Sequence, residues 1–126
     1  MKIYIFECSS ATYLDCLEKS VFGSNRPWPL QIKKGEYCLL NHYEVGMLFG
    51  IWQASADGGK NIVPKAWGGR FPFQANVVLA STAIVEIPKA EIAENLLNAD
   101  TGRLDNLLEG NNADILLQSL RKHADI

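Results

Sequence analysis

The side chains best suited to chemistry in this chain are its three tryptophans, two of which stand among turn-forming residues. Trp28 lies between two prolines and Trp67 precedes two glycines, whereas Trp52 lies in an apolar run. An indole ring offers a flat π-face on which an unstacked base can stack, with a gain of roughly 1–3 kcal/mol per base. Ordinary packing is the alternative for each ring, and burial is the default for Trp52 because a strand is predicted there.

Polar side chains near these rings are candidates for contacts with base edges or phosphates. Ser9, Ser10 and Asn41 carry hydroxyl or amide groups that both donate and accept hydrogen bonds. Helix capping is the commoner role for the two serines. Arg70 is the strongest phosphate candidate, since two neighbouring glycines permit close backbone approach, and Phe71 adds a ring beside it. The weaker phosphate candidates are scattered lysines of the kind that usually lie on a solvated surface, namely Lys33, Lys34, Lys60 and Lys65.

The sequence offers no recognisable arrangement for catalysis. His42 and His123 are the only histidines, and neither has a nucleophile and an orienting acid at an identifiable spacing. The 3 cysteines lack CxxC spacing, which argues against a zinc site and against a disulfide framework. A phosphate-binding GxxxxGK[ST] loop is also absent. We therefore expect a non-catalytic binding module that uses no cofactor and no metal.

Composition is that of one folded domain. A chain of 126 residues, 48% hydrophobic and 21% charged, suffices for one core but not for two ordinary domains. No apolar run approaches the roughly 20 residues of a membrane span, and no signal peptide is recognisable, so we expect a cytoplasmic protein without membrane contact. Residues 1–85 carry eight Lys/Arg against six Asp/Glu, and residues 86–126 carry four against eight. A polyanion is therefore expected on the first part.

Hydrophobic periodicity and turn residues predict the elements that must position these side chains. Ile3 and Ile5 alternate with Tyr4 and Phe6 in a first strand, and a helix of about ten residues follows Thr12. The pattern then predicts a loop over 23–29, antiparallel strands over 37–41 and 46–54, a long loop over 55–72, a bent strand over 75–87, and helices around 92–97, 104–108 and 115–120. This order favours an α+β fold with a mixed, mostly antiparallel sheet curled into a small barrel.

Four segments in order carry a more specific pattern. They comprise Phe6 with residues 16–18 and 21–23, then residues 37–42, 48–54 and 64–74, and the string AWGGRFP at 66–72 is the most distinctive. Together they resemble the DCD (development and cell death) domain family over roughly residues 3–90. In these terms the chain is one DCD-like domain over 1–126, with a barrel core over 1–90 and an acidic helical extension over 91–126.

The resemblance implies a PUA-like barrel, similar to the EVE and YTH domains that read modified bases, in a family associated with plant development, stress and cell death. It also implies a base pocket bordered by residues 8–10 and 67–71, with RNA or single-stranded DNA as partner. Family members usually carry basic residues on the strand after the Phe-Pro element, whereas 75–85 contains none. A protein-interaction or stress-signalling module without nucleic-acid binding is therefore the alternative. An ASCH-like hydrolase is a weaker one.

Overall fold

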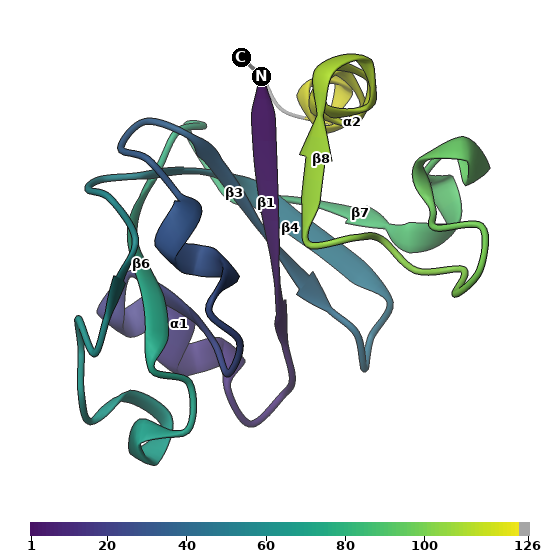
Figure 1. Ribbon diagram of the computed structural model, residues 1–126. Coiled ribbons are helices and arrows are strands. Elements are labelled where there is room, and N and C mark those ends of the chain that lie inside the picture. Colours follow the sequence, from purple (N-terminus) through teal and green to yellow (C-terminus); the bar gives the residue numbers. More distant parts are fainter. Residues whose placement is uncertain (124–126) are drawn as a thin grey trace.

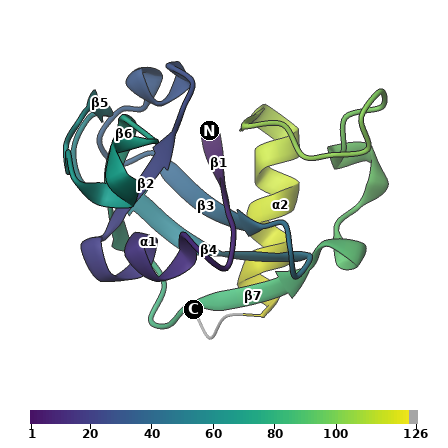
Figure 2. The same ribbon diagram turned by 90° about the horizontal axis from the view of Figure 1, so that it is seen from below.

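The chain folds around a curled mixed sheet that has one α-helix on each side (Figures 1 and 2). The computed structural model describes residues 1–123. The elements in chain order are β1 (Lys2–Cys8), α1 (Tyr13–Lys19), β2 (Val21–Ser24), η1 (Trp28–Gln31), β3 (Tyr37–His42), β4 (Met47–Ala54), β5 (Gly59–Lys60), η2 (Ala66–Gly69), β6 (Phe73–Leu79), β7 (Val85–Pro88), η3 (Lys89–Glu91), η4 (Glu94–Leu96), β8 (Leu107–Glu109) and α2 (Gly110–Lys122), where η denotes a 3-10 helix. None of the helices in this range is long and apolar enough to cross a membrane.

The sheet contains one parallel pair of strands. Its order is β2-β6-β4-β3-β1-β8, with β5 beside β6 and β7 beside β4. β1 and β3 run parallel, and the other strand pairs are antiparallel. A parallel pair needs a long crossover, which here contains α1, β2 and η1. The predicted mixed, mostly antiparallel sheet is confirmed, and so is the antiparallel pairing of residues 37–41 with the following strand.

β1 is buried on both faces and separates two apolar clusters. Tyr4 and Phe6 point into an aromatic-rich cluster on the α1 side. Ile3 and Ile5 point into an aliphatic cluster that includes the buried side chains of α2. Successive side chains of a strand alternate between its faces, so the predicted alternation of isoleucines and aromatic rings is what assigns each face to its own helix.

Several predicted boundaries in the first 90 residues are wrong. The helix after Thr12 has 7 residues, because Ser20 adopts a left-handed conformation (φ 51°) and ends it. The predicted loop over 23–29 begins with the end of β2 and finishes in η1.

The predicted single strand over 75–87 is two strands, β6 and β7. Between them the hydroxyl of Ser81 accepts a hydrogen bond from the Ile51 N–H (3.2 Å) and donates one to the Ala83 carbonyl (2.7 Å). Between β6 and β7, these hydrogen bonds of the Ser81 side chain take the place of backbone hydrogen bonds between strands.

The tail is less helical than its leucine spacing suggests. Residues 92–97 and 104–108, predicted as two helices, instead contain one 3-10 helix, η4, and the start of β8. The Asn98 side-chain oxygen accepts hydrogen bonds from the N–H groups of Asp100 and Thr101, and Gly102 adopts a φ of 68°, so the chain turns before a helix can propagate. The predicted helix around 115–120 is confirmed as the centre of α2.

The last two elements are part of the main sheet and core. β8 pairs antiparallel with β1, and Leu116, Leu117 and Leu120 of α2 are buried in the aliphatic cluster. Leu120 also lies against Gly50 of β4, where a side chain would meet its methyl groups at 3.7–3.8 Å. The tail therefore covers one face of the sheet.

Truncation of Leu116, which is 0% exposed, is expected to lower the free energy of unfolding. Leu116→Ala leaves a cavity between α2 and the sheet and should cost about 2–5 kcal/mol. The matched control is Leu14→Ala on α1, where the side chain is 63% exposed and the change should stay within about 0.5 kcal/mol. Urea unfolding followed by circular dichroism measures both. Equal stability of the two variants would show that α2 does not contribute to the core.

Candidate functional site

Two cavities lie at the carboxyl ends of the parallel strands β1 and β3. The first has a volume of about 380 Å³, within the roughly 300–1,000 Å³ range of small-molecule pockets. It is lined by Glu7, Cys8, Ser9, Thr12, Gly23, Ser24, Asn25, Arg26, Trp28, Tyr43, Phe71 and Asn106. The second has a volume of about 460 Å³ and is lined by Glu7, Asn41, Tyr43, Lys89 and Arg103. Glu7 and Tyr43 belong to both, so the two cavities adjoin at the end of β1.

The first cavity has an aromatic wall. The Trp28 ring stacks parallel to Tyr4, with ring centroids 6.1 Å apart and an interplanar angle of 2°, and it leans on Phe6 at 4.6 Å. Trp28 is only half-buried, because η1 places it at the border between the core and the cavity. Pro27 and Pro29 restrict the backbone on either side of the ring and thereby fix its position. Phe71 and the exposed Tyr43 complete the aromatic part of the lining.

Polar groups form the rest of the wall, in two turns that are internally bonded. The Ser9 carbonyl accepts hydrogen bonds from the N–H groups of Thr12 (3.1 Å) and Tyr13 (2.9 Å), and the Ser9 N–H donates to the Thr12 hydroxyl (2.9 Å). Thr12 occupies the N-cap position of α1, but its hydroxyl makes no capping bond. On the opposite wall the Ser24 hydroxyl accepts from the Arg26 N–H at 3.1 Å. Hydroxyl groups and one guanidinium thus border the aromatic surface.

Trp67 does not line either cavity. The ring is 6% exposed, its Nε1–H donates to the Thr12 carbonyl at 3.3 Å, and it packs so closely on Gly23 that a Cβ there would lie 2.5 Å from the ring. Its backbone is left-handed (φ 51°), as are Gly68 and Gly69, at a cost of roughly 1–2 kcal/mol for a non-glycine residue. The Trp-Gly-Gly string therefore reverses the chain and inserts the indole behind the cavity wall.

The structure divides the remaining predicted site residues. Trp52 is 6% exposed in the aromatic cluster, with its ring 5.0 Å from that of Phe22. Arg70 is exposed, donates to the Trp67 carbonyl at 3.0 Å and lies over the Phe71 ring, but it lines neither cavity. The exposed Ser10 is held by a hydrogen bond from its N–H to Glu44. Of the predicted set, Ser9, Trp28 and Phe71 meet at the first cavity, and Asn41 lines the second.

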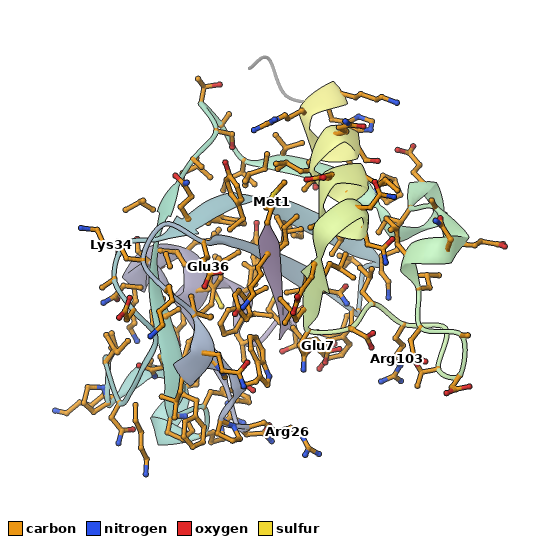
Figure 3. All side chains as sticks on the ribbon, turned by 45° about the horizontal axis from the view of Figure 1, so that its top comes forward. Met1, Glu7, Arg26, Lys34, Glu36 and Arg103 are labelled. Atoms are coloured by element: carbon orange, nitrogen blue, oxygen red, sulfur yellow. The ribbon has the colours of Figure 1, made fainter. Side chains whose placement is uncertain are left out.

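Sequence reasoning missed the charged residues of both cavities. Arg26 precedes Trp28 by two positions in a segment rich in turn-forming residues. The closeness of a cation to a loop tryptophan was the signal that could have identified it. Lys89 and Arg103 come from the acidic tail, which gave no such signal. Figure 3 shows Glu7 and Arg103 near the carboxyl end of β1 with Arg26 below them, whereas Lys34 lies well away.

Cys8 contributes a buried thiol to the first cavity. Burial raises the pKa of Cys8 to about 12, with further increases from nearby Cys16, Glu44 and Glu7. Burial likewise raises the pKa of Cys16 and that of Cys38 to about 12. His42 is buried against the Tyr13 ring (5.5 Å) and the Phe49 ring. Within residues 1–123 no group of three or more His, Cys, Asp or Glu side chains is arranged to hold a metal ion.

The three thiols are expected to stay protonated and unreactive in the folded protein. At pH 8 iodoacetamide should alkylate them at least about tenfold more slowly than in urea, because the thiolate is the nucleophile. Each folded-state pKa lies above its unfolded value, so their contribution to stability is present below about pH 9 and is lost as the pH rises towards 12. Mass spectrometry and pH-dependent urea unfolding measure the two effects. Fast labelling of Cys8 in the native state would contradict this description.

The architecture just described is that of a YTH-like α+β domain. The YTH domain of Zygosaccharomyces rouxii MRB1, solved with N6-methyladenosine RNA, superimposes with a TM-score of 0.66 over 95% of this chain and 86% of that one, at 15% identity. The Mmi1 YTH domain, solved with RNA, gives a TM-score of 0.72 over 96% of this chain and 78% of that one, at 14% identity. At these identities the likeness concerns the fold.

The chain belongs to the Development and cell death domain family, which residues 2–101 match. Among relatives, DCD domain-containing protein NRP-B of Glycine max is 34% identical over 89 residues, which cover 63% of this chain and 27% of that protein. The B2 protein of Daucus carota is 33% identical over 60% of this chain and 41% of that protein. The chain thus spans less than half the length of these relatives. The family match ends before β8 and α2, which complete the sheet and the core here.

Proposed function

We propose that this domain is a non-catalytic binding module that takes one unstacked base of a single-stranded nucleic acid, RNA in the first instance, into the first cavity. The observation that carries the proposal is the position of Trp28. Its half-buried ring is fixed by stacking on Tyr4 and forms the wall of a cavity whose polar groups include hydroxyls, amides, the Arg26 guanidinium and the Glu7 carboxylate. A flat heterocycle with hydrogen-bonding edges and an anionic backbone suits that combination.

The solved relatives support the same proposal. The MRB1 and Pho92 YTH domains share this fold and were solved with N6-methyladenosine RNA and with m6A, respectively. A methylated base is a larger apolar ligand than its parent, and an aromatic wall favours it through contact area. We therefore include a methylated base among the ligands of this site.

Binding is tested by fluorescence anisotropy with labelled single-stranded oligonucleotides. Four homopolymeric RNAs, an adenine-containing RNA with and without N6-methylation, and matching DNAs separate the alternatives of base, modification and sugar. The proposal expects saturable binding of at least one RNA that weakens as salt is raised, because phosphate contacts release counterions. Absence of salt-sensitive binding with every oligonucleotide would refute it.

Trp28→Leu is expected to weaken the binding of that RNA by about 5- to 150-fold, since stacking of one base contributes roughly 1–3 kcal/mol. Leucine keeps an apolar contact with Tyr4 and Phe6 but removes the π-face. The matched control is Phe73→Leu, which changes another half-buried ring, on β6 and outside both cavities. Both variants are checked for folding by circular dichroism. Equal weakening in the two variants would place the base elsewhere.

A second candidate function, protein interaction, is favoured by one specific feature. Val78, Leu79 and Ile84 are 53%, 38% and 42% exposed where β6 leads into β7. Ala80, which follows Leu79 in the chain, lines a groove together with Tyr37, Ile51, Leu117 and Arg121. Neighbouring exposed apolar side chains mark interaction surfaces more often than isolated ones do. Co-purification with and without nuclease separates the two functions, because only partners held through nucleic acid are lost on digestion.

A further inference from the structure

The second cavity continues the first around the end of β1. Both are lined by Glu7 and Tyr43, so a chain leaving the first cavity at these residues enters the second without crossing the core. The strand register pairs Glu7 of β1 with Asn41 of β3. Asn41, which lines the second cavity, therefore lies beside a residue that lines the first. The two cavities therefore form one extended surface.

Two cations without partners face this second cavity. Neither Lys89 nor Arg103 forms a salt bridge with any residue of the described range, so no carboxylate neutralises them; of the 12 Lys and Arg residues there, only Lys19 and Lys33 are paired. Their backbones are fixed independently of each other. The Lys89 N–H donates to the Gly46 carbonyl at 2.9 Å, and the Arg103 carbonyl accepts from the Asn98 N–H at 2.7 Å. Two unpaired cations held on one cavity from separate turns suit an anionic ligand.

Asn41 supplies an independent sign of a ligand. The side chain is 3% exposed, lines the second cavity, and its Oδ1 atom has no hydrogen-bond partner. Buried polar groups in native proteins are nearly always paired, and an exception calls for a partner such as a bound molecule. The two ends of an amide are assigned from their surroundings, so this side chain can accept from a hydroxyl or donate to a phosphate oxygen.

We infer that the second cavity binds the phosphodiester adjacent to the base held in the first cavity. A single-stranded polynucleotide then passes around the end of β1, with Tyr43 between the two subsites. This inference rests on the proposed function. The phosphate sits towards Lys89 and Arg103, because the Glu7 carboxylate repels it from the border of the cavities. Cations outnumber carboxylates two to one in the lining, which disfavours a basic peptide there.

The test compares a ligand that has a backbone with one that lacks it. The double variant K89Q/R103Q and the control K34Q, an exposed lysine outside both cavities, are titrated with the single-stranded RNA that the wild-type protein binds. The free nucleosides of that RNA, which have no phosphate, are titrated in parallel by NMR. Glutamine removes the charge and retains a long polar side chain, so folding is expected to be preserved in all variants.

We expect K89Q/R103Q to weaken RNA binding at least about tenfold and to reduce the slope of log affinity against log salt by about 0.7, the value for one lost phosphate contact in a single strand. Nucleoside binding should stay within about twofold of the wild-type value, because nucleosides reach only the first cavity. K34Q should change neither measurement.

Three outcomes overturn the inference. RNA affinity and salt slope equal to wild type would remove the phosphate subsite while leaving the base cavity intact. An equal loss of RNA and nucleoside binding would mean that Lys89 and Arg103 support the base cavity and not a phosphate. If the wild-type protein binds neither RNA nor nucleosides, the proposed function fails, and the phosphate subsite fails with it.

Discussion

The parallel pairing of β1 with β3 is the constraint on which the rest of the structure depends. Because the two strands run in the same direction, Glu7 lies beside Asn41 and Cys8 beside His42 at one end of the sheet. The crossover that parallel strands require carries α1 and η1 and returns Trp28 to the same end. In open α/β sheets the carboxyl ends of parallel strands are a common place for ligands, and the corresponding end of the one parallel pair carries the cavities here. One register thus assembles both cavities.

Alternation along β1 also separates the roles of the two faces. The face with Tyr4 and Phe6 supports the Trp28 ring, so the packing that stabilises the core also orients the cavity wall. The opposite face, with Ile3 and Ile5, is covered by α2. Glu7 lies on the same face of β1 as Ile3 and Ile5, but beyond the part of that face that α2 covers, and its side chain is exposed. The change from isoleucine to glutamate marks the point where the core ends and the extended surface begins.

The local patterns of the sequence predicted strands better than sites. The alternation in 3–6 and the apolar runs at 37–41 and 46–54 identified three strands of the sheet, because strand burial depends on neighbouring positions. The leucines of 92–108 have helical spacing, but Asn98 and Gly102 turn the chain and tertiary packing buries Leu104 and Leu108 without a helix. Tertiary contacts determine the secondary structure of such segments, and the periodicity of the sequence carries no information about those contacts.

Only part of the candidate site could be predicted from the sequence, because local patterns show turns and helix starts but not tertiary contacts. Ser9, Trp28 and Phe71, which line the first cavity, could be chosen from the sequence because each stands next to a turn or a helix start, which is local information. For Trp67 the same glycines had two interpretations, since a chain reversal can present a ring to solvent or insert it inward. Here Gly23 of β2 offers space for the indole and the Thr12 carbonyl accepts its N–H, so the ring turns inward. The tryptophan in the most distinctive string of the sequence therefore shapes the wall from behind.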